Sequence, residues 1–130
     1  MQEPYWIGKG AAMAMHERQL AEHGGISGTR DEGLLESALD KPKNLFFYSD
    51  APVDMARLAA SYAYGIATNH PFLDGNKRTA HVVARTFLLL NGYNLEASQE
   101  EKYKTIMALA ASEMDEDALA AWFAKNTKKS

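Results

Sequence analysis

The nine residues from His70 to Arg78, HPFLDGNKR, combine one imidazole, one carboxylate, one amide, one glycine and two cations. An imidazole suits general-base work because it accepts a proton readily near neutral pH. One carboxylate suffices to hold Mg²⁺ when phosphate oxygens supply other ligands. With a cationic clamp for the phosphates, these groups are the parts that phosphoryl transfer requires. The stretch therefore predicts His70 as the base and Asp74 as the metal ligand.

The second half of this stretch is expected to open a helix near Gly75 or Asn76, because apolar residues recur at helical spacing after it. The first backbone N–H groups of a helix have no partner within it and carry the positive end of its dipole, so they bind anions. Gly75 lets the backbone come close to a phosphate. A bound anion would also relieve the repulsion between this dipole and the cations Lys77 and Arg78. We therefore predict that Gly75, Asn76, Lys77 and Arg78 bind phosphate groups.

The elements around the site are predicted to be helices, because helical spacing runs through the chain and no convincing alternating strand pattern interrupts it. Glycine, proline and capping residues divide the chain into segments with short links. The expected helices cover approximately residues 7–23, 29–39, 52–68, 75–90, 98–112 and 115 onwards. The predicted fold class is all-α, a compact bundle of about six helices in which only the last few residues are frayed.

Local signals refine this arrangement. Thr29 to Glu32 fits a capping box that starts the second helix, and Pro42 is expected to end it or to begin the next turn. The aromatic stretch 44–50, NLFFYSD, fits either a short extended flap before the central helix or a final helical turn. His16 and His23 share one helix face, but they are spaced too widely to bind a metal without a third ligand. They are interpreted as ordinary helix-face residues.

Composition limits the class of protein. A chain of 130 residues with 46% hydrophobic residues predicts one domain, residues 1–130, with a core of its own. The chain has no cysteine, which excludes disulfides and thiolate metal sites. A net charge of −3 with scattered basic residues argues against a broad nucleic-acid interface. No signal peptide pattern and no membrane-spanning apolar run are visible, so a cytoplasmic protein without nucleic acid or membrane as partner is expected.

The motif from His70 to Arg78 resembles the signature of the Fic family, HxFx(D/E)GNGRxxR. It is more similar to the Doc (death-on-curing) variant, HxFx(D/N)(A/G)NKR. The similarity extends to both sides and covers residues 7–93. Its matching segments are His16–Leu20, His23–Gly25, Arg30–Asp31, Gly33–Leu39, Arg78–Ala80 and Asn91–Tyr93. The resemblance implies the Fic/Doc fold and a toxin of a toxin–antitoxin module.

The resemblance also implies a role for each matched residue. His70 would deprotonate a hydroxyl of the target protein, Asp74 would hold Mg²⁺ on the phosphates of ATP, and Phe72 would anchor the loop to the core. The anion hole would comprise Gly75, Asn76 and Arg78. Lys77 replaces the second glycine of the broader pattern. In Doc-like proteins this lysine accompanies a reversed nucleotide that presents its γ-phosphate, so that the reaction is phosphorylation, with elongation factor Tu as the type of target.

One further departure and two alternatives accompany this interpretation. The final arginine of the broader pattern falls on His81, and Arg85, one turn later on the same helix face, is the candidate replacement. A Fic-type protein adenylyltransferase shares every site residue and differs in the orientation of the nucleotide. A non-catalytic module that binds an antitoxin would keep the fold without the reaction. The stretch Phe46–Tyr48 fits a flap that docks the target as well as it fits core packing.

Regulation is expected to come from a second protein. Some Fic proteins carry an inhibitory helix that reads [S/T]xxxE[G/N], and the nearest approach here, from Ser112 to Glu116, is interrupted by an expected helix break. A separate Phd-like antitoxin is therefore the expected partner, with a disordered segment that folds onto a groove of the bundle.

Overall fold

The fold consists of six helices and two short strands over residues 2–130, the part of the chain that the computed structural model describes. Their bounds are α1 (Lys9–His23), α2 (Glu32–Tyr48), α3 (Met55–Asn69), α4 (Asn76–Leu90), β1 (Tyr93–Leu95), α5 (Gln99–Ala110), α6 (Glu116–Asn126) and β2 (Thr127–Lys129). The predicted all-α bundle is confirmed. Within residues 2–130, no helix combines the length and the apolar character that a membrane crossing requires.

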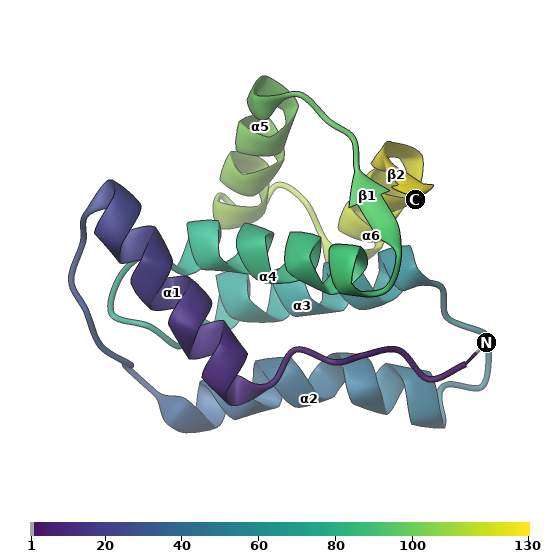
Figure 1. The fold of residues 1–130 in the computed structure, drawn as a ribbon, viewed down its shortest axis with the longest axis horizontal. Helices are drawn as coiled ribbons and strands as arrows, with labels where there is room; N and C mark the ends of the chain where they lie inside the picture. Colours follow the sequence, from purple (N-terminus) through teal and green to yellow (C-terminus); the bar gives the residue numbers. More distant parts are fainter. Residues whose placement is uncertain (1) are drawn as a thin grey trace.

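Helix α3 forms the centre of the bundle. Ten of its fifteen residues are buried, and it packs against α2, α4 and α6. Figure 1 shows α2 along one side of α3, with α4 beside it and α1 crossing α4 obliquely. At Gly65, a Cβ atom would lie only 3.2 Å from the Cβ atom of Ala38 in α2. The glycine therefore allows α2 and α3 to approach closely just ahead of the loop that follows α3.

Four helices begin at a side chain that caps the first turn. The caps Asp31, Asp54, Ser98 and Asp115 accept hydrogen bonds of 3.0, 2.8, 3.1 and 2.8 Å from the backbone N–H three residues later. Ser98 and Asp115 lie at the predicted starts of the last two helices. The predicted capping box at Thr29 is wrong, because Asp31 takes this role and α2 begins at Glu32. Thr29 instead forms an isolated β-bridge with Phe72.

Helix α2 does not end at Pro42, contrary to the prediction. It continues to Tyr48, so the aromatic stretch forms its final turns rather than an extended flap. A proline inside a helix removes one hydrogen bond and crowds the carbonyl four residues earlier, which costs about 3 kcal/mol. Pro42 is itself buried, and Leu45 and Phe46 beyond it pack against the core. Their burial offsets this cost.

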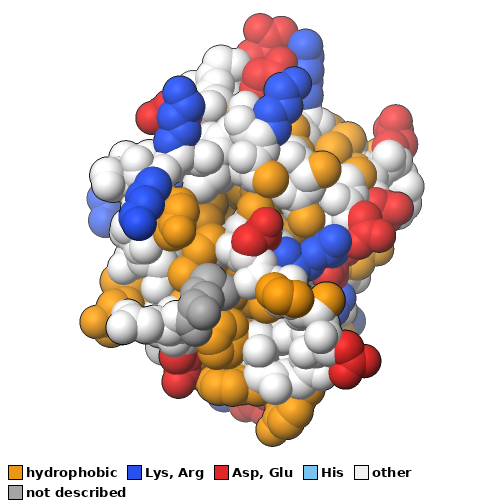
Figure 2. Space-filling model, turned by 90° about the vertical axis from the view of Figure 1, so that its right-hand side faces the viewer, with side chains coloured by type: hydrophobic (Ala, Val, Ile, Leu, Met, Phe, Trp, Pro, Cys, Tyr) orange, Lys and Arg blue, Asp and Glu red, His pale blue; other side chains and the backbone are white. Residues whose placement is uncertain are grey.

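The aromatic end of α2 is divided between core and surface. The Trp6 ring meets Phe46 edge-on at a centroid distance of 5.7 Å and stacks on Phe87 at 6.0 Å. Phe47 and Tyr48 are 51% and 80% exposed. Figure 2 shows hydrophobic side chains open to solvent between charged ones on the face that includes the N-terminal end of the chain. Core packing is thus confirmed for Phe46 alone.

The last residues form a strand, although a frayed tail was predicted. Strand β2 pairs antiparallel with β1, so that Lys129 lies opposite Tyr93 and Thr127 lies opposite Leu95. Each strand has three residues, which is too short to produce a visible alternation of apolar and polar side chains. Leu95 is buried in the core, and this ribbon therefore ties the C-terminal segment to the end of α4.

Candidate active site

The loop between α3 and α4 opens into a cleft with a volume of about 530 Å³, a size in the range of small-molecule sites. Helix α5 forms the facing wall with Tyr103, Ile106 and Met107. All six site residues predicted from the sequence line this one cleft: His70, Asp74, Gly75, Asn76, Lys77 and Arg78. The short motif therefore forms one continuous surface.

His70 is held through its backbone at the C-terminus of α3. It adopts the left-handed conformation, with φ 49° and ψ 56°, and its N–H donates to the Ile66 carbonyl oxygen at 3.2 Å. The Arg30 guanidinium donates to the carbonyl oxygens of His70 and Asn69 at 2.7 and 2.8 Å. The last carbonyls of a helix lack internal partners and carry the negative end of its dipole, so a cation is favourable there. Arg30 thus fixes the backbone from which the exposed imidazole extends.

The segment before α2 runs along the site loop and holds it in place. The backbone N–H groups of Arg30 and Asp31 both donate to the Pro71 carbonyl oxygen, at 2.7 and 3.0 Å. The Leu73 N–H donates to the Gly28 carbonyl oxygen at 3.1 Å. Phe72, between these contacts, is buried, which confirms the predicted anchor of the loop.

Helix α4 presents an uncapped N-terminus to the cleft. Gly75 precedes it at φ 75°, a conformation that glycine adopts without strain. No side chain among the described residues caps the first turn, and the Thr79 N–H donates to the Gly75 carbonyl oxygen at 3.0 Å. The N–H groups of Asn76, Lys77 and Arg78 are therefore oriented so that an anion in the cleft could bind to them. The exposed side chains of Lys77 and Arg78 add positive charge to the same cleft.

Asn76 has a different task from its neighbours. Its buried side chain closes the site loop, because Oδ1 accepts from the Phe72 N–H at 2.9 Å and Nδ2 donates to the Phe72 carbonyl oxygen at 3.0 Å. Both ends of the amide are used within the protein. A phosphate bound at this site would therefore contact Asn76 through its backbone N–H.

Asp74 carries a carboxylate that two backbone N–H groups hold. Gly75 donates to Oδ1 at 2.9 Å and Ile26 donates to Oδ2 at 3.2 Å. Each carboxylate oxygen has a further lone pair for a metal. No three His, Cys, Asp or Glu side chains gather into a metal site anywhere in residues 2–130. A cation at Asp74 would take its other ligands from phosphates and water, as Mg²⁺ does, so this donor set fits Mg²⁺ bound together with a nucleotide.

Sequence reasoning missed two residues that support Asp74. His16 is buried, and its Nε2 lies 2.7 Å from the Asp74 carbonyl oxygen, so it is more than an ordinary helix-face residue. A Cβ atom at Gly25, where φ is 131°, would lie 2.8 Å from Oδ2 of Asp74. Gly25 was visible in the sequence at the end of the first expected helix and in a segment that resembles the Doc family, but no role at the site was assigned to it. His23, the other histidine of α1, is exposed.

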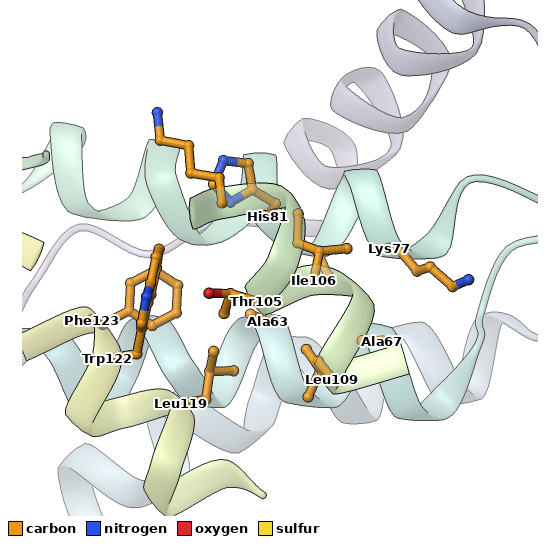
Figure 3. Close-up of a pocket in the computed structure, with 12 residues that line it drawn as sticks. Ala63, Ala67, Lys77, His81, Thr105, Ile106, Leu109, Leu119, Trp122 and Phe123 are labelled. Atoms are coloured by element: carbon orange, nitrogen blue, oxygen red, sulfur yellow. The ribbon is translucent and has the colours of Figure 1, made fainter. Parts of the chain in front are cut away.

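His81 does not supply the positive charge of the arginine that it replaces. It lies on α4 at a cavity of about 10 Å³ between α3, α4, α5 and α6, and Figure 3 shows the largely apolar lining. Burial, assisted by the charges of Lys102 and Arg85, lowers the pKa of His81 to about 4, so the imidazole is neutral at physiological pH. Arg85 lines a neighbouring groove, which shares Arg78 with the site cleft.

The half-buried His81 should make the fold sensitive to acid. The ordinary histidine pKa of 6.5 applies to the unfolded chain, which therefore binds this proton more tightly than the folded protein does. The free energy of unfolding should fall as the pH drops from 6.5 to about 4, by on the order of 1–3 kcal/mol. His81→Leu should remove this part of the pH dependence. Urea unfolding of both proteins across that range measures it, and parallel profiles would contradict the prediction.

The fold and the cleft together define a class of protein. A helical bundle that brings a histidine, a carboxylate and a cationic helix N-terminus together in one loop agrees with the architecture that the motif implied. The Fic/DOC family matches residues 6–88 of the chain. This match covers most of the chain and includes the whole site loop. The chain therefore belongs to the Fic/Doc family.

Two relatives point to the Doc branch of this family. The chain is 37% identical over 100 residues to Toxin Doc of Mycolicibacterium smegmatis, a match that covers 75% of this chain and 77% of the relative. It is 32% identical over 88 residues to Protein kinase doc of Escherichia phage P1, with 68% and 69% covered. Both names agree with the closer similarity of the motif to the Doc variant.

Proposed function

We propose that this protein is a toxin kinase that transfers the γ-phosphate of Mg-ATP to a hydroxyl of another protein. One observation carries the proposal: a single cleft gathers His70, the Asp74 carboxylate and the uncapped first turn of α4 with Lys77 and Arg78. The names of the two relatives, one a toxin and one a protein kinase, support the two halves of the proposal.

In this reaction His70 is the catalytic base. Its side chain is exposed in the cleft, where a substrate hydroxyl can reach it. His70 takes the hydroxyl proton as the substrate oxygen bonds to the γ-phosphorus, the bond from that phosphorus to the β,γ-bridging oxygen breaks, and ADP leaves. The first-turn N–H groups of α4, with Lys77 and Arg78, stabilise the charge on the phosphoryl oxygens. At Asp74, Mg²⁺ would neutralise further phosphate charge.

Lys77 favours phosphoryl transfer over adenylyl transfer. A glycine at this position would let the backbone amides close around a diphosphate. Lys77 instead brings a side chain and a charge into that space, so the nucleotide binds with its γ-phosphate next to His70. The wall of α5 opposite this cradle is apolar, and Tyr103, 65% exposed, offers a ring on which the nucleotide base can stack.

The partners in this proposal follow from the resemblance to Doc toxins. The acceptor is elongation factor Tu, whose modification arrests translation, and the site of action is the cytoplasm. A toxin of this kind needs a restraint, and a Phd-like antitoxin supplies it by folding a disordered segment onto the bundle. Expression without the antitoxin should therefore stop bacterial growth.

Transfer from two labelled nucleotides tests the proposed reaction. The protein is incubated with bacterial lysate and ATP labelled at either the γ- or the α-phosphate. The γ-label should appear on a protein of the size of elongation factor Tu, and chelation of Mg²⁺ should prevent it. No α-label should be transferred, because the α-phosphate stays in ADP. Transfer of the α-label would make the protein an adenylyltransferase, and transfer of neither label would support a non-catalytic module.

A further inference from the structure

His16 of α1 lies directly beneath the loop that carries Asp74. The side chain is buried, with a relative exposure of 1%. Its Nε2 lies 2.7 Å from the Asp74 carbonyl oxygen, and because a carbonyl oxygen only accepts, Nε2 carries the proton of this hydrogen bond. We propose that His16 is a positioning residue that orients the Asp74 carboxylate for the metal. This inference rests on the proposed function, because it assigns His16 a task toward the Mg²⁺ that Asp74 would hold.

The hydrogen bond from His16 reaches the carboxylate through one peptide plane. In a trans peptide the C=O of one residue and the N–H of the next are rigidly coplanar and point in opposite directions. The Asp74 C=O accepts from His16, and the Gly75 N–H of the same peptide donates to Oδ1 of Asp74 at 2.9 Å. Rotation of this peptide would break both bonds together. His16 therefore holds the donor that orients Oδ1.

The ring of His16 also fixes the loop on its other side. It stacks on Phe72 with a centroid distance of 3.8 Å and an interplanar angle of 6°. Phe72 in turn has its backbone N–H and C=O bonded to the buried side chain of Asn76. The His16 ring on α1 thus contacts the loop both at Asp74 and at Phe72 before it. Such support of a metal ligand is characteristic of metal sites, in which residues behind the ligand set its orientation.

The packing around this ring leaves little room for adjustment. A Cβ atom at Gly75 would lie 3.4 Å from Leu20 and 3.8 Å from His16. A Cβ atom at Gly25, opposite the carboxylate, would lie 2.8 Å from both Leu20 and Oδ2 of Asp74. A replacement at position 16 therefore has to fit the same space, and it can keep either the donor to Asp74 or the ring against Phe72. Separating these two contributions is the basis of the test.

The test compares affinities for a non-hydrolysable ATP analogue with Mg²⁺ and with a chelator. The quantity of interest is the gain in affinity that Mg²⁺ confers, measured by calorimetry well below the unfolding temperature. His16→Phe keeps a ring against Phe72 but lacks the donor. His16→Gln places an amide N–H near the position of Nε2. His23→Phe, on the same helix but exposed, is the matched control, and Asp74→Ala removes the metal ligand itself.

In His16→Phe the gain from Mg²⁺ should fall about 10-fold or more, while metal-free binding of the analogue stays close to that of the parent. His16→Gln and His23→Phe should both retain the gain. If His16→Phe does not fold, His16→Asn takes its place, since the shorter amide does not reach the Asp74 carbonyl. An unchanged gain in a folded variant without the donor would overturn the role of His16. A parent that gains nothing from Mg²⁺, like Asp74→Ala, would instead overturn the proposed metal site.

Discussion

Replacing His70 with asparagine should abolish growth arrest and lower the rate of phosphoryl transfer by about 10²–10⁴-fold, the usual cost of losing a general base. Asparagine disturbs the backbone less than most substitutions would, because His70 has a positive φ of 49° and asparagine tolerates this region better than most residues. The backbone that Arg30 holds should therefore stay in place. The variant removes the proton acceptor and keeps the loop.

The measurement combines growth after induction with the transfer of γ-label to protein in lysate. The thermal unfolding temperature and the binding of Mg-ATP should stay near the parent values, because the phosphate cradle is built from α4 and not from His70. His23→Asn is the matched control on an exposed histidine outside the cleft. Growth arrest by a folded His70→Asn protein would mean that toxicity comes from binding alone.

The part of the site that the sequence predicted is the part that is local in the chain. His70 to Arg78 span the end of one helix, a short loop and the start of the next, so their spacing alone places them on one surface. The start of α4 follows from the same reasoning, because this helix was expected to begin near Gly75 or Asn76. Within this stretch the sequence did not indicate the role of the Asn76 side chain, which closes the loop through two hydrogen bonds to the Phe72 backbone.

The parts that escaped prediction depend on contacts between distant segments. His16 reaches Asp74 across 58 positions, and Arg30 reaches His70 across 40. The wall of α5 with Tyr103 comes from a helix that the motif does not include. A single sequence gives the residue types at these positions. It does not show which helix faces pack against each other, because that depends on the tertiary structure. The two histidines of α1 illustrate this limit, because one is buried beneath the site and the other is exposed.

The errors in the fold have the same origin. Pro42 is a strong local signal for a helix end, yet burial of Pro42 and of the residues that follow carries α2 onwards to Tyr48. The C-terminal residues have no strand pattern of their own, and they become a strand only because β1 offers an edge. In both cases a tertiary contact outweighed a local preference.

Arg30→Ala should give the second largest loss, about 10²-fold in the rate of transfer, although Arg30 does not line the cleft. The guanidinium bonds two carbonyls at the end of α3, and one of them belongs to His70. Without it, the left-handed turn at His70 loses both side-chain bonds to its carbonyls, and the imidazole should move away from the substrate hydroxyl. A displacement of about 1 Å is enough for a loss of this size.

Arg30→Lys separates geometry from charge, because lysine keeps the cation but cannot donate to two carbonyls from one planar fork. Compared with Arg30→Ala, Arg30→Lys should regain more of the stability of the fold than of the rate of phosphoryl transfer. Binding of Mg-ATP should change little in either variant, so that kcat falls and the KM for ATP stays constant. Arg18→Ala is the matched control, since Arg18 is exposed and, among residues 2–130, pairs with Glu22 alone, one turn away. If the rate in Arg30→Ala falls only in proportion to the folded fraction, Arg30 stabilises the loop without positioning the base.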